Sequence, residues 1–508
     1  MIIVYHNSKH VVSVINDDNT LPVFSTNTTL TEELLNIAKA NSNQLLIWCH
    51  IDLKELLNIS QLTKIFHHNY ILATFHPFSN IPIHDAIGYI DRSFYIKINT
   101  SNTYPTWLMS AWVGGILSST LIKFSSIIET TNSFNYNLLS IAKLGQNEGL
   151  LCYSEPKLLI NNPKWKAQQF FCQTTLFKFV KTHYKWFWVW YLCLCYFLYE
   201  KKFPFLDAIK TVFLKRLTLD FNFDNDLKST KKIVKNGSID VIIPTIGRKD
   251  YLFNVLKDLS KQTFLPKSVI IVEQNPKLTS KSDLSYINTE IWPFKIIHHF
   301  IHQLGVVNAR NIALKEVTSE WVLLGDDDNR FEPNLIEKLF EKVTQYGVKC
   351  GLTVYLKPGE TQYFLKSGQT PIFGGGNAIL KSDLLNKVKF NSKFEFSYGE
   401  DTDFGMQIRH TGEDVIYFSD VIITHLKAPF GGFRTKFIHP WDSESIQPLP
   451  SPAIMYLHKK YYTHKQLKGY KLLYFIRRFK QEKVINFIAF ISKFNKQWVK
   501  SDFWSKKM

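Results

Sequence analysis

The sequence predicts a mixed α/β fold whose second half forms a mostly parallel, Rossmann-like sheet. Short apolar segments alternate there with segments of helical periodicity, which is the pattern of strands joined by crossover helices. A chain of 508 residues is long enough for two or three domains with sizeable cores. The predicted strands span 239–243, 268–272, 294–297 and 320–324, and the predicted helices span 250–262 and 307–317.

Polar residues follow three of these predicted strands directly. Pro244-Thr245 comes after the first strand, Glu273–Asn275 after the second, and Asp326–Asp328 after the fourth. Ligands of open α/β sheets bind beyond the carboxyl ends of the strands. We therefore expect these three clusters to line one site.

Residues 1–163 are predicted to form another α/β domain, and short similarities indicate that it is a degenerate copy of the later sheet. Leu45–Ile47 resembles Val322–Leu324, and Gly115–Leu117 resembles Ala378–Leu380. If both pairs of segments are strands, the two halves share a fold.

The acidic residues of the second half have no counterparts in this proposed copy. When the similar segments are aligned, Gly149 falls on Gly412. The residues that then face the acids are His50–Asp52 opposite Asp326–Asp328, and Asn137-Leu138 opposite Glu400-Asp401. The first half is therefore expected to keep the fold without the chemistry, and carbohydrate binding is one role left to it.

Three further segments complete the predicted organisation: a helical, aromatic connector over 164–237, the main α/β domain over 238–441, and a basic helical tail over 442–508. The longest apolar run, Trp186–Tyr199, has 14 residues. A membrane-spanning helix needs about 20, so this run is predicted to be a buried or interfacial helix. The six scattered cysteines and the lack of a secretory leader favour a cytoplasmic protein.

The net charge of +18 is concentrated near the C-terminus, where residues 451–508 hold 14 Lys and Arg but only two acids. Aromatic and aliphatic residues recur there at three- and four-residue steps. A basic amphipathic helix of this kind is typical of binding to an anionic membrane surface, here the inner face of the cell membrane. The alternative is a helical hairpin packed on the preceding domain with a solvated basic face. Nucleic acid is not expected as a partner, because no nucleic-acid-binding motif accompanies the charge.

Asp326–Asp328 is the strongest chemical signal in the sequence. Three successive carboxylates at a strand end repel one another unless a cation lies among them, and Mg²⁺ and Mn²⁺ favour such hard oxygen ligands. Alone, the triplet fits equally well an Asp-rich turn that caps the next helix.

Three downstream features strengthen the metal-site interpretation. Gly374–Asn377 allows close backbone approach to a ligand, Gly399–Asp403 places acids at a helix start, and His425 ends a predicted strand over 421–425. Each also has an ordinary explanation: a turn, a helix cap and a packed histidine.

In this order, these elements resemble the family 2 glycosyltransferases, which have the GT-A fold. The resemblance covers about 200 residues within 238–441. It reaches residues 1–163 only through the proposed repeat, which would make them a degenerate GT-A-like domain. The elements that carry it are Val241–Thr245, Val272–Gln274, Asn308–Asn311, Asp326–Asp328, Gly374–Asn377, Glu400-Asp401 and His425.

The resemblance implies a role for each matching residue. Asp326 and Asp328 would be the DxD pair that contacts ribose and metal, with His425 as a third ligand of Mn²⁺ or Mg²⁺. Asp401 would be the catalytic base and Glu400 would help to position the acceptor or the base. The other implied site residues are Pro244, Thr245, Glu273, Arg310 and Asp327 for the donor, and Gly375, Gly376 and Asn377 beside the acceptor and the donor sugar.

The implied function is inverting, nonprocessive, metal-dependent sugar transfer to a glycan or lipid-linked hydroxyl in surface polysaccharide or glycoconjugate synthesis. Glu273 stands where the family usually has Asp, so the donor could be UDP- or GDP-linked. Gln407–Arg409 lacks the Gln-x-x-Arg-Trp element of processive synthases. Arg434 and Trp441 are candidates for a lid or for plain packing. The competing functions are a sugar-phosphate nucleotidyltransferase and a carbohydrate-binding scaffold.

Overall fold

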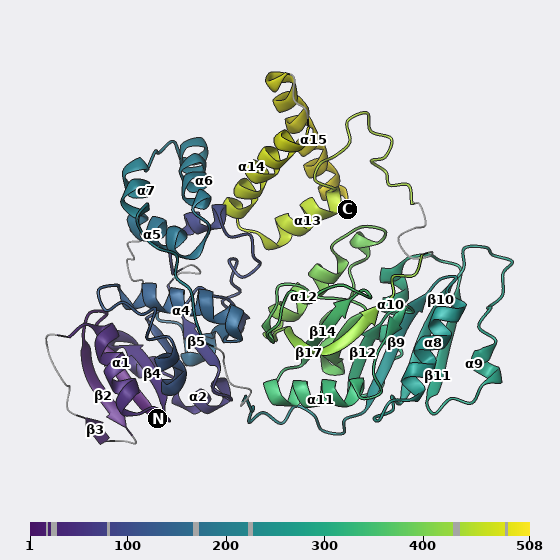
Figure 1. Ribbon diagram of the computed structural model, residues 1–508, viewed down its shortest axis with the longest axis horizontal. Helices are drawn as coiled ribbons and strands as arrows, with labels where there is room; N and C mark the ends of the chain where they lie inside the picture. Colours follow the sequence, from purple (N-terminus) through teal and green to yellow (C-terminus); the bar gives the residue numbers. More distant parts are fainter. Residues whose placement is uncertain are drawn as a thin grey trace. The chain divides into compact units, whose positions relative to one another are not determined.

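The computed structural model describes residues 1–16, 19–21, 28–78, 82–165, 172–221, 227–429, 437–482 and 486–508 (Figure 1). Contacts between residues group the chain into two compact units. The first unit comprises Met1–Thr230 and Tyr461–Lys483, and the second comprises Lys231–Lys460 and Val484–Met508. The four-part division expected from the sequence stays a prediction.

The second unit is built on a mixed sheet whose strands run in the order β11-β10-β9-β12-β16-β14-β17-β13, with β15 paired to β17. Strands β11, β10, β9 and β12 are mutually parallel, which confirms the predicted Rossmann-like half-sheet. The strands are β9 (Ile239–Thr245), β10 (Ser268–Gln274), β11 (Lys295–Ile301), β12 (Trp321–Gly325), β13 (Asn329–Arg330), β14 (Cys350–Leu356), β15 (Gly368–Gln369), β16 (Asn377–Lys381) and β17 (Ile416–His425).

Alternate side chains of the buried strands form the core of this unit. Ile242 of β9 and Leu324 of β12 belong to one apolar cluster with Val307, Ala313 and Phe404 of the covering helices. This packing fixes α10 and α12 against the sheet. The helices of the unit are α8 (Lys249–Ser260), α9 (Tyr286–Thr289), α10 (Val306–Lys315), α11 (Leu335–Tyr346), α12 (Glu400–His410), α13 (Pro452–Tyr461) and α15 (Phe487–Lys507), with 3₁₀ turns η5 (Ser382–Asn386) and η6 (Ser392–Phe394).

The third predicted strand is longer than its sequence pattern indicates. The apolar run ends at Ile297, but β11 continues to Ile301 because its backbone stays paired with β10 along its whole length. The polar residues His298 and His299 interrupt the apolar pattern without interrupting these pairs.

The first unit has a sheet in the order β3-β2-β1-β4-β7-β5-β8-β6. Its strands are β1 (Ile2–His6), β2 (Val11–Asn16), β3 (Asn19–Leu21), β4 (Leu45–His50), β5 (Ile71–Phe75), β6 (Tyr104–Pro105), β7 (Val113–Leu117) and β8 (Leu151–Ser154). Its helices are α1 (Leu30–Ala40), α2 (Ile59–Ile65), α3 (Ser118–Lys123), α4 (Phe134–Glu148), α5 (Gln173–His183), α6 (Phe187–Cys195), α7 (Phe205–Thr211) and α14 (His464–Gln481), with short turns η1 (Ile51–Leu56), η2 (Asp85–Tyr89), η3 (Pro156–Leu158) and η4 (Tyr196–Glu200).

Most of this sheet repeats the pairing pattern of the second unit, as the sequence predicted. Five neighbouring strands correspond: β1-β4-β7-β5-β8 in the first unit and β9-β12-β16-β14-β17 in the second. In both series the first pair is parallel, the next two pairs are antiparallel, and the last pair is parallel. The register agrees as well, because Leu46 lies opposite Ile116 and Leu323 lies opposite Ile379. Gly149 and Gly412, which follow equivalent helices, both have positive φ.

The observed register corrects one detail of the predicted alignment. Trp48 pairs with Gly114 as Gly325 pairs with Asn377, so Cys49–Ile51 stand at the positions of Asp326–Asp328. The sequence alignment, which used His50–Asp52, was one residue late, because the matched segments Leu45–Ile47 and Val322–Leu324, continued without a gap, already place Cys49 opposite Asp326. The conclusion that the three acids are absent from this edge is unchanged.

The two sheets differ on the outer side of their first strand. In the first unit β1 pairs with the antiparallel hairpin β2-β3, whereas in the second unit β9 pairs with the parallel strand β10. Among the described residues of the first unit, the strand that ends in Glu273-Gln274 therefore has no parallel counterpart.

The predicted helical tail is confirmed, but its helices pack in different units. α14 belongs to the first unit, while α13 and α15 belong to the second, where Phe490 and Phe494 are buried. Within the described residues, no helix combines the length and the hydropathy needed to cross a bilayer.

Asp240 stabilises the turn before β12, the strand that carries the acidic triplet. Its buried carboxylate accepts hydrogen bonds from the backbone N–H groups of Thr318 and Ser319, at 2.8 and 2.9 Å, and from the Ser319 hydroxyl at 2.8 Å. Asp240→Ala leaves these buried donors unpaired and should lower the free energy of unfolding by about 2–4 kcal/mol.

Chemical denaturation measures this change, and Asp383→Ala is the matched control. Asp383 is half exposed and pairs only with Lys349 among the described residues, so its loss should cost less than about 1 kcal/mol. Equal effects of the two substitutions would contradict the structural role of Asp240.

Candidate active site

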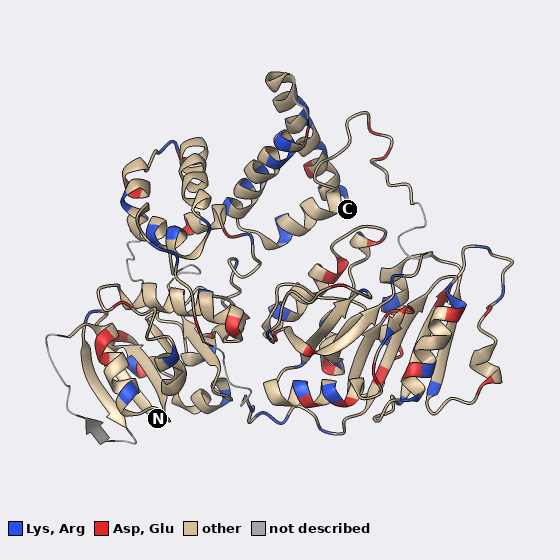
Figure 2. Cartoon of the chain, viewed as in Figure 1, with Lys and Arg blue, Asp and Glu red and all other residues tan. Residues whose placement is uncertain are grey.

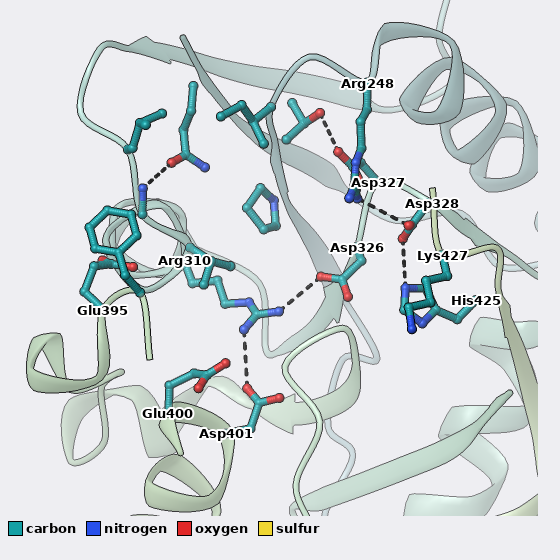
Figure 3. Close-up of a pocket in the computed structure, with 18 of the residues that line it drawn as sticks. Arg248, Arg310, Asp326, Asp327, Asp328, Glu395, Glu400, Asp401, His425 and Lys427 are labelled. Atoms are coloured by element: carbon teal, nitrogen blue, oxygen red, sulfur yellow. Dashed lines mark hydrogen bonds and ion pairs between the residues drawn. The ribbon is translucent and has the colours of Figure 1, made fainter. Parts of the chain in front are cut away.

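A cavity of about 440 Å³ lies at the carboxyl ends of the strands in the second unit (Figure 3). Nine of the predicted site residues line it: Pro244, Thr245, Arg310, Asp326, Asp327, Asp328, Glu400, Asp401 and His425. The other lining residues are Ile246, Arg248, Gln274, Leu304, Gly305, Val306, Glu395, Phe396, Tyr398 and Lys427. The strand-end clusters therefore meet in one place.

The predicted metal ligands Asp326, Asp328 and His425 form a compact triad. Each offers one ligand atom, and these atoms lie within 4.8 Å of one another. Strand pairing explains the approach, because Asn329 of β13 lies opposite His425 at the end of β17. Asp328 Oδ1 lies 3.3 Å from His425 Nε2 and is buried without a hydrogen bond of normal geometry. Such an atom is suited to a cation, so the residues fit a divalent metal.

Negative charge predominates in the cavity. Six carboxyl side chains line it, against the three cationic side chains Arg248, Arg310 and Lys427. Arg248 Nη1 lies 2.7 Å from Asp327 Oδ1 and 3.3 Å from Asp328 Oδ2, so it balances only part of this charge. This excess of negative charge is compatible with a divalent cation.

The carboxylates respond differently to this environment. Burial raises the pKa of Asp327 to about 6, against the opposing effects of Arg248 and the Thr245 hydroxyl. Burial also opposes ionisation of Asp328, but His425 and the backbone N–H of Ala428 outweigh it and lower the pKa of Asp328. Asp328 is thus prepared to act as an anionic ligand, whereas Asp327 is held by Thr245 and Arg248.

Arg310 connects the metal triad to the predicted base. Its guanidinium is buried, with Nη2 3.1 Å from Asp326 Oδ1 and Nη1 3.3 Å from Asp401 Oδ1. The guanidinium also lies over the Phe390 ring, 5.3 Å from its centre. These partners hold one cation between the two acids and fix their separation.

Asp401 and Glu400 begin α12, where the helix N-terminus favours negative charge. The Asp401 side chain is 33% exposed, which leaves its carboxylate accessible from the cavity. Burial raises the pKa of Asp401 although Arg310 acts in the opposite direction. Burial and the like charge of Asp401 raise the pKa of Glu400. The pair has the raised proton affinity that a general base requires.

The predicted glycines lie against this network and do not line the cavity. A Cβ atom at Gly375 would collide with the Arg310 guanidinium and the Asp401 carboxylate, and one at Gly376 would collide with the Asp326 carboxylate. Asn377 is buried and donates a hydrogen bond to the Thr353 carbonyl at 2.8 Å. These contacts give the three residues a packing role, and their contact with acceptor or donor sugar stays a prediction.

Glu273 does not line the cavity although it lies near the end of β10, as expected. It accepts a hydrogen bond from the Ser282 hydroxyl at 2.6 Å and pairs with His298 Nε2 at 2.9 Å. Its neighbour Gln274 lines the cavity and accepts a hydrogen bond from the backbone N–H of Gly305 at 2.7 Å. A role for Glu273 in base binding stays a prediction.

Sequence reasoning missed Arg248, Tyr355 and Glu395. The Tyr355 hydroxyl lies 2.9 Å from Asp326 Oδ2, and its ring stacks on His425 with centroids 4.6 Å apart. Glu395 accepts hydrogen bonds from the first turn of α10, at the N–H groups of Val307 and Asn308. Arg248 could have been found, because it follows the predicted strand-end cluster by three residues.

The two lid candidates remain unassigned. Arg434 lies in 430–436, outside the described residues. Trp441 stacks on His439 with ring centroids 4.4 Å apart, which is a packing contact.

Comparison with known proteins identifies this part of the chain. A family model described as Glycosyl transferase family 2 matches residues 240–400. The uncharacterized glycosyltransferase YwdF of Bacillus subtilis is 32% identical over 105 residues, 21% of this chain and 38% of that protein. An uncharacterized glycosyltransferase of Haemophilus influenzae is 29% identical over 137 residues, 24% of this chain and 45% of that protein. The chain therefore spans less than half the length of these relatives.

Similarity to solved structures is weaker. S. aureus TarS 1-349 in complex with UDP-GlcNAc has a TM-score of 0.36 and 19% identity, over 46% of this chain and 70% of that chain. The mannosyltransferase PcManGT from Pyrobaculum calidifontis, in complex with GDP-Man and Mn²⁺, has a TM-score of 0.33 and 20% identity, over 40% of this chain and 62% of that chain.

The matched segment contains most of the cavity, including Asp326–Asp328, Arg310 and Glu400, while Asp401 and His425 follow it. On the sequence match, residues 240–400 belong to glycosyl transferase family 2.

Proposed function

We propose that the second unit transfers a sugar from a UDP- or GDP-linked donor to an acceptor hydroxyl, with inversion and without processivity. The carrying observation is that the triad Asp326, Asp328 and His425 lines the same cavity as Asp401, with Arg310 between them. Sugar transfer needs a stabilised diphosphate leaving group and a separate proton acceptor, and this cavity offers residues for both.

The acidic triplet and His425 would bind the donor through a divalent metal. Asp326, Asp328 and His425 would hold Mn²⁺ or Mg²⁺, and the nitrogen ligand favours Mn²⁺. When bound, the metal would neutralise the charge that develops on the departing diphosphate. Thr245 and Arg248 hold Asp327 in place, at 2.7 Å each, and so keep the triplet in one conformation for the donor.

The acceptor side belongs to Asp401. Its partly exposed carboxylate can take the proton of an attacking hydroxyl, and Arg310 holds it at a fixed distance from Asp326. A proton acceptor that is separate from the donor site supports a single displacement, which inverts the configuration at the sugar carbon.

The acceptor is proposed to be a glycan or a lipid-linked sugar in surface polysaccharide or glycoconjugate synthesis. The basic segment 451–508 supports a position on the inner face of the cell membrane, where such acceptors are built. In the first unit, the exposed residues Arg477 and Lys480 of α14 could face anionic lipid.

Asp401→Asn should lower kcat by at least about 100-fold because the amide cannot accept the proton. The KM for the donor should change less than threefold, since the triad is untouched. Asp420→Asn is the matched control, because Asp420 is an exposed acid of the same unit that pairs with Lys342. Turnover near that of the wild type in Asp401→Asn would remove Asp401 as the base.

Removal of divalent metal should abolish both turnover and donor binding. With EDTA-treated protein, a nucleoside diphosphate should raise the melting temperature only after Mn²⁺ is added. A nucleoside diphosphate present at 100 times its Kd should raise the free energy of unfolding by about 2.7 kcal/mol. Asp328→Asn should weaken this response because a triad ligand is lost.

The released product separates the transferase from its closest competitor. Nucleoside diphosphate is expected, whereas pyrophosphate would show a nucleotidyltransferase. Metal-independent stabilisation by glycan alone, without turnover, would show a carbohydrate-binding protein.

A further inference from the structure

α6, η4 and α7 pack against one another as a helical layer of the first unit (Figure 1), and many of their exposed side chains are apolar. Isolated exposed apolar residues are ordinary, but contiguous ones mark an interaction site. The exposed large apolar residues of this segment are Trp186, Phe187, Trp190, Leu194, Phe197, Leu198, Phe203, Phe205, Leu206, Ile209, Val212 and Phe213. We call these residues the 186–213 surface.

The exposed residues of α6 and η4 lie on one helical face. They recur at spacings of one, three and four residues, from Trp186 and Phe187 through Trp190 and Leu194 to Phe197. The opposite face is packed into the unit, where Val189, Leu192, Cys193 and Tyr196 are buried. The solvent-facing stripe of this helix is therefore apolar, which reverses the usual pattern of a surface helix.

α7 and the turn that follows it extend the same surface. Phe205, Leu206, Ile209, Val212 and Phe213 again follow helical spacing, and Phe213 is 92% exposed. Ring contacts join the two stripes: the centroids of Trp190 and Phe205 are 5.9 Å apart, and those of Phe197 and Phe203 are 6.2 Å apart. The twelve side chains thus form one patch.

Tyrosine hydrogen bonds hold the underside of this patch in place. The Tyr191 hydroxyl donates to the Gly469 carbonyl at 2.6 Å, and the Tyr199 hydroxyl donates to the Lys468 carbonyl at 3.1 Å. These bonds fix α6 and η4 to α14. The apolar face is therefore presented by a well-packed scaffold.

Exposed basic residues are interspersed with the apolar residues of this segment. Between 185 and 216 the sequence has six Lys and Arg and two acids. Both acids are bound to other parts of the unit, Glu200 to Lys465 at 2.7 Å and Asp207 to Gln173 at 2.7 Å. Figure 2 shows Lys and Arg recurring along α14, whereas α7 carries Lys210 and the acid Asp207. The six cations, all exposed, are Lys185, Lys201, Lys202, Lys210, Lys215 and Arg216.

We propose that the 186–213 surface docks the protein on an anionic lipid bilayer by inserting its aromatic and aliphatic side chains into the interface. Tryptophan and phenylalanine rings with flanking lysines match the interfacial zone, where apolar groups meet acidic headgroups. The 14-residue run is too short to cross the bilayer. The lysine rim favours lipid over an apolar protein partner or a second copy of the chain. Docking through this surface does not depend on sugar transfer.

Flotation of the full chain with vesicles tests the proposal. Wild-type protein should float with vesicles containing one quarter phosphatidylglycerol and much less with phosphatidylcholine alone. A quadruple serine variant should show a vesicle partition coefficient at least tenfold lower than the wild type. Its substitutions are Trp186→Ser, Phe197→Ser, Leu206→Ser and Phe213→Ser. All four side chains are exposed, so the fold should survive.

A matched variant controls for the loss of exposed apolar area. This control variant replaces four comparably exposed apolar residues of the second unit, and its partitioning onto vesicles should equal that of the wild type. Its substitutions are Leu278→Ser, Ile291→Ser, Tyr363→Ser and Leu365→Ser. Lys201→Glu, Lys202→Glu and Lys210→Glu should weaken binding to anionic vesicles only. Lys493→Glu with Lys496→Glu separates any contribution of α15.

Hydrogen exchange on the wild-type chain gives a readout that needs no substitution. Peptides covering 186–213 should gain protection when anionic vesicles are added. Unchanged flotation of the quadruple serine variant, or no added protection, would overturn the proposal. A different outcome would assign the surface to a second copy of the chain. In that outcome the wild-type protein dimerises without lipid, the quadruple serine variant does not, and both bind vesicles equally.

Discussion

The site depends on one buried guanidinium. Arg310 pairs with Asp326 on one side and Asp401 on the other, so a single guanidinium holds one proposed metal ligand and the proposed proton acceptor at a fixed separation. Six carboxyl groups in one cavity would otherwise repel one another. The glycines at 375 and 376 leave room for this arrangement, because a side chain at either position would displace Arg310, Asp401 or Asp326. The strand pairing of β13 with β17 adds His425 to the same cluster.

The first unit shows what remains of the fold when this charge pattern is lost. In the shared register His6 occupies the position of Thr245, and His50 occupies the position of Asp327. The centroids of the two histidine rings lie 5.5 Å apart. Burial lowers the pKa of His6 to about 3, so that ring is neutral near pH 7. Burial also lowers the pKa of His50. Two neutral imidazoles supply none of the negative charge of the Asp326–Asp328 edge, and the described residues of the first unit include no counterpart of β10, whose Gln274 lines the cavity in the second unit. The first unit instead presents the 186–213 surface, so the two units divide chemistry and proposed membrane docking between them.

The sequence predicted features whose signals are local. Apolar strands ending in polar clusters placed Thr245, Asp326 and Asp328 at one sheet edge, and all three line the cavity. Features set by long-range pairing were not predictable. The Tyr355 hydroxyl reaches Asp326 only because β14 joins the sheet beside β16, and α14 packs in the first unit although it follows the second in sequence. The position of the β2-β3 hairpin, where the second unit has a parallel strand, likewise depends on long-range strand pairing.

A crystal structure of the full chain with Mn²⁺ and a non-hydrolysable nucleotide-sugar analogue tests the central claim most directly. Anomalous scattering should locate Mn²⁺ among Asp326, Asp328 and His425, in contact with the diphosphate, while Asp401 faces the sugar from the same cavity. Manganese bound elsewhere with the analogue in place, or Asp401 turned away from the sugar carbon, would contradict the account.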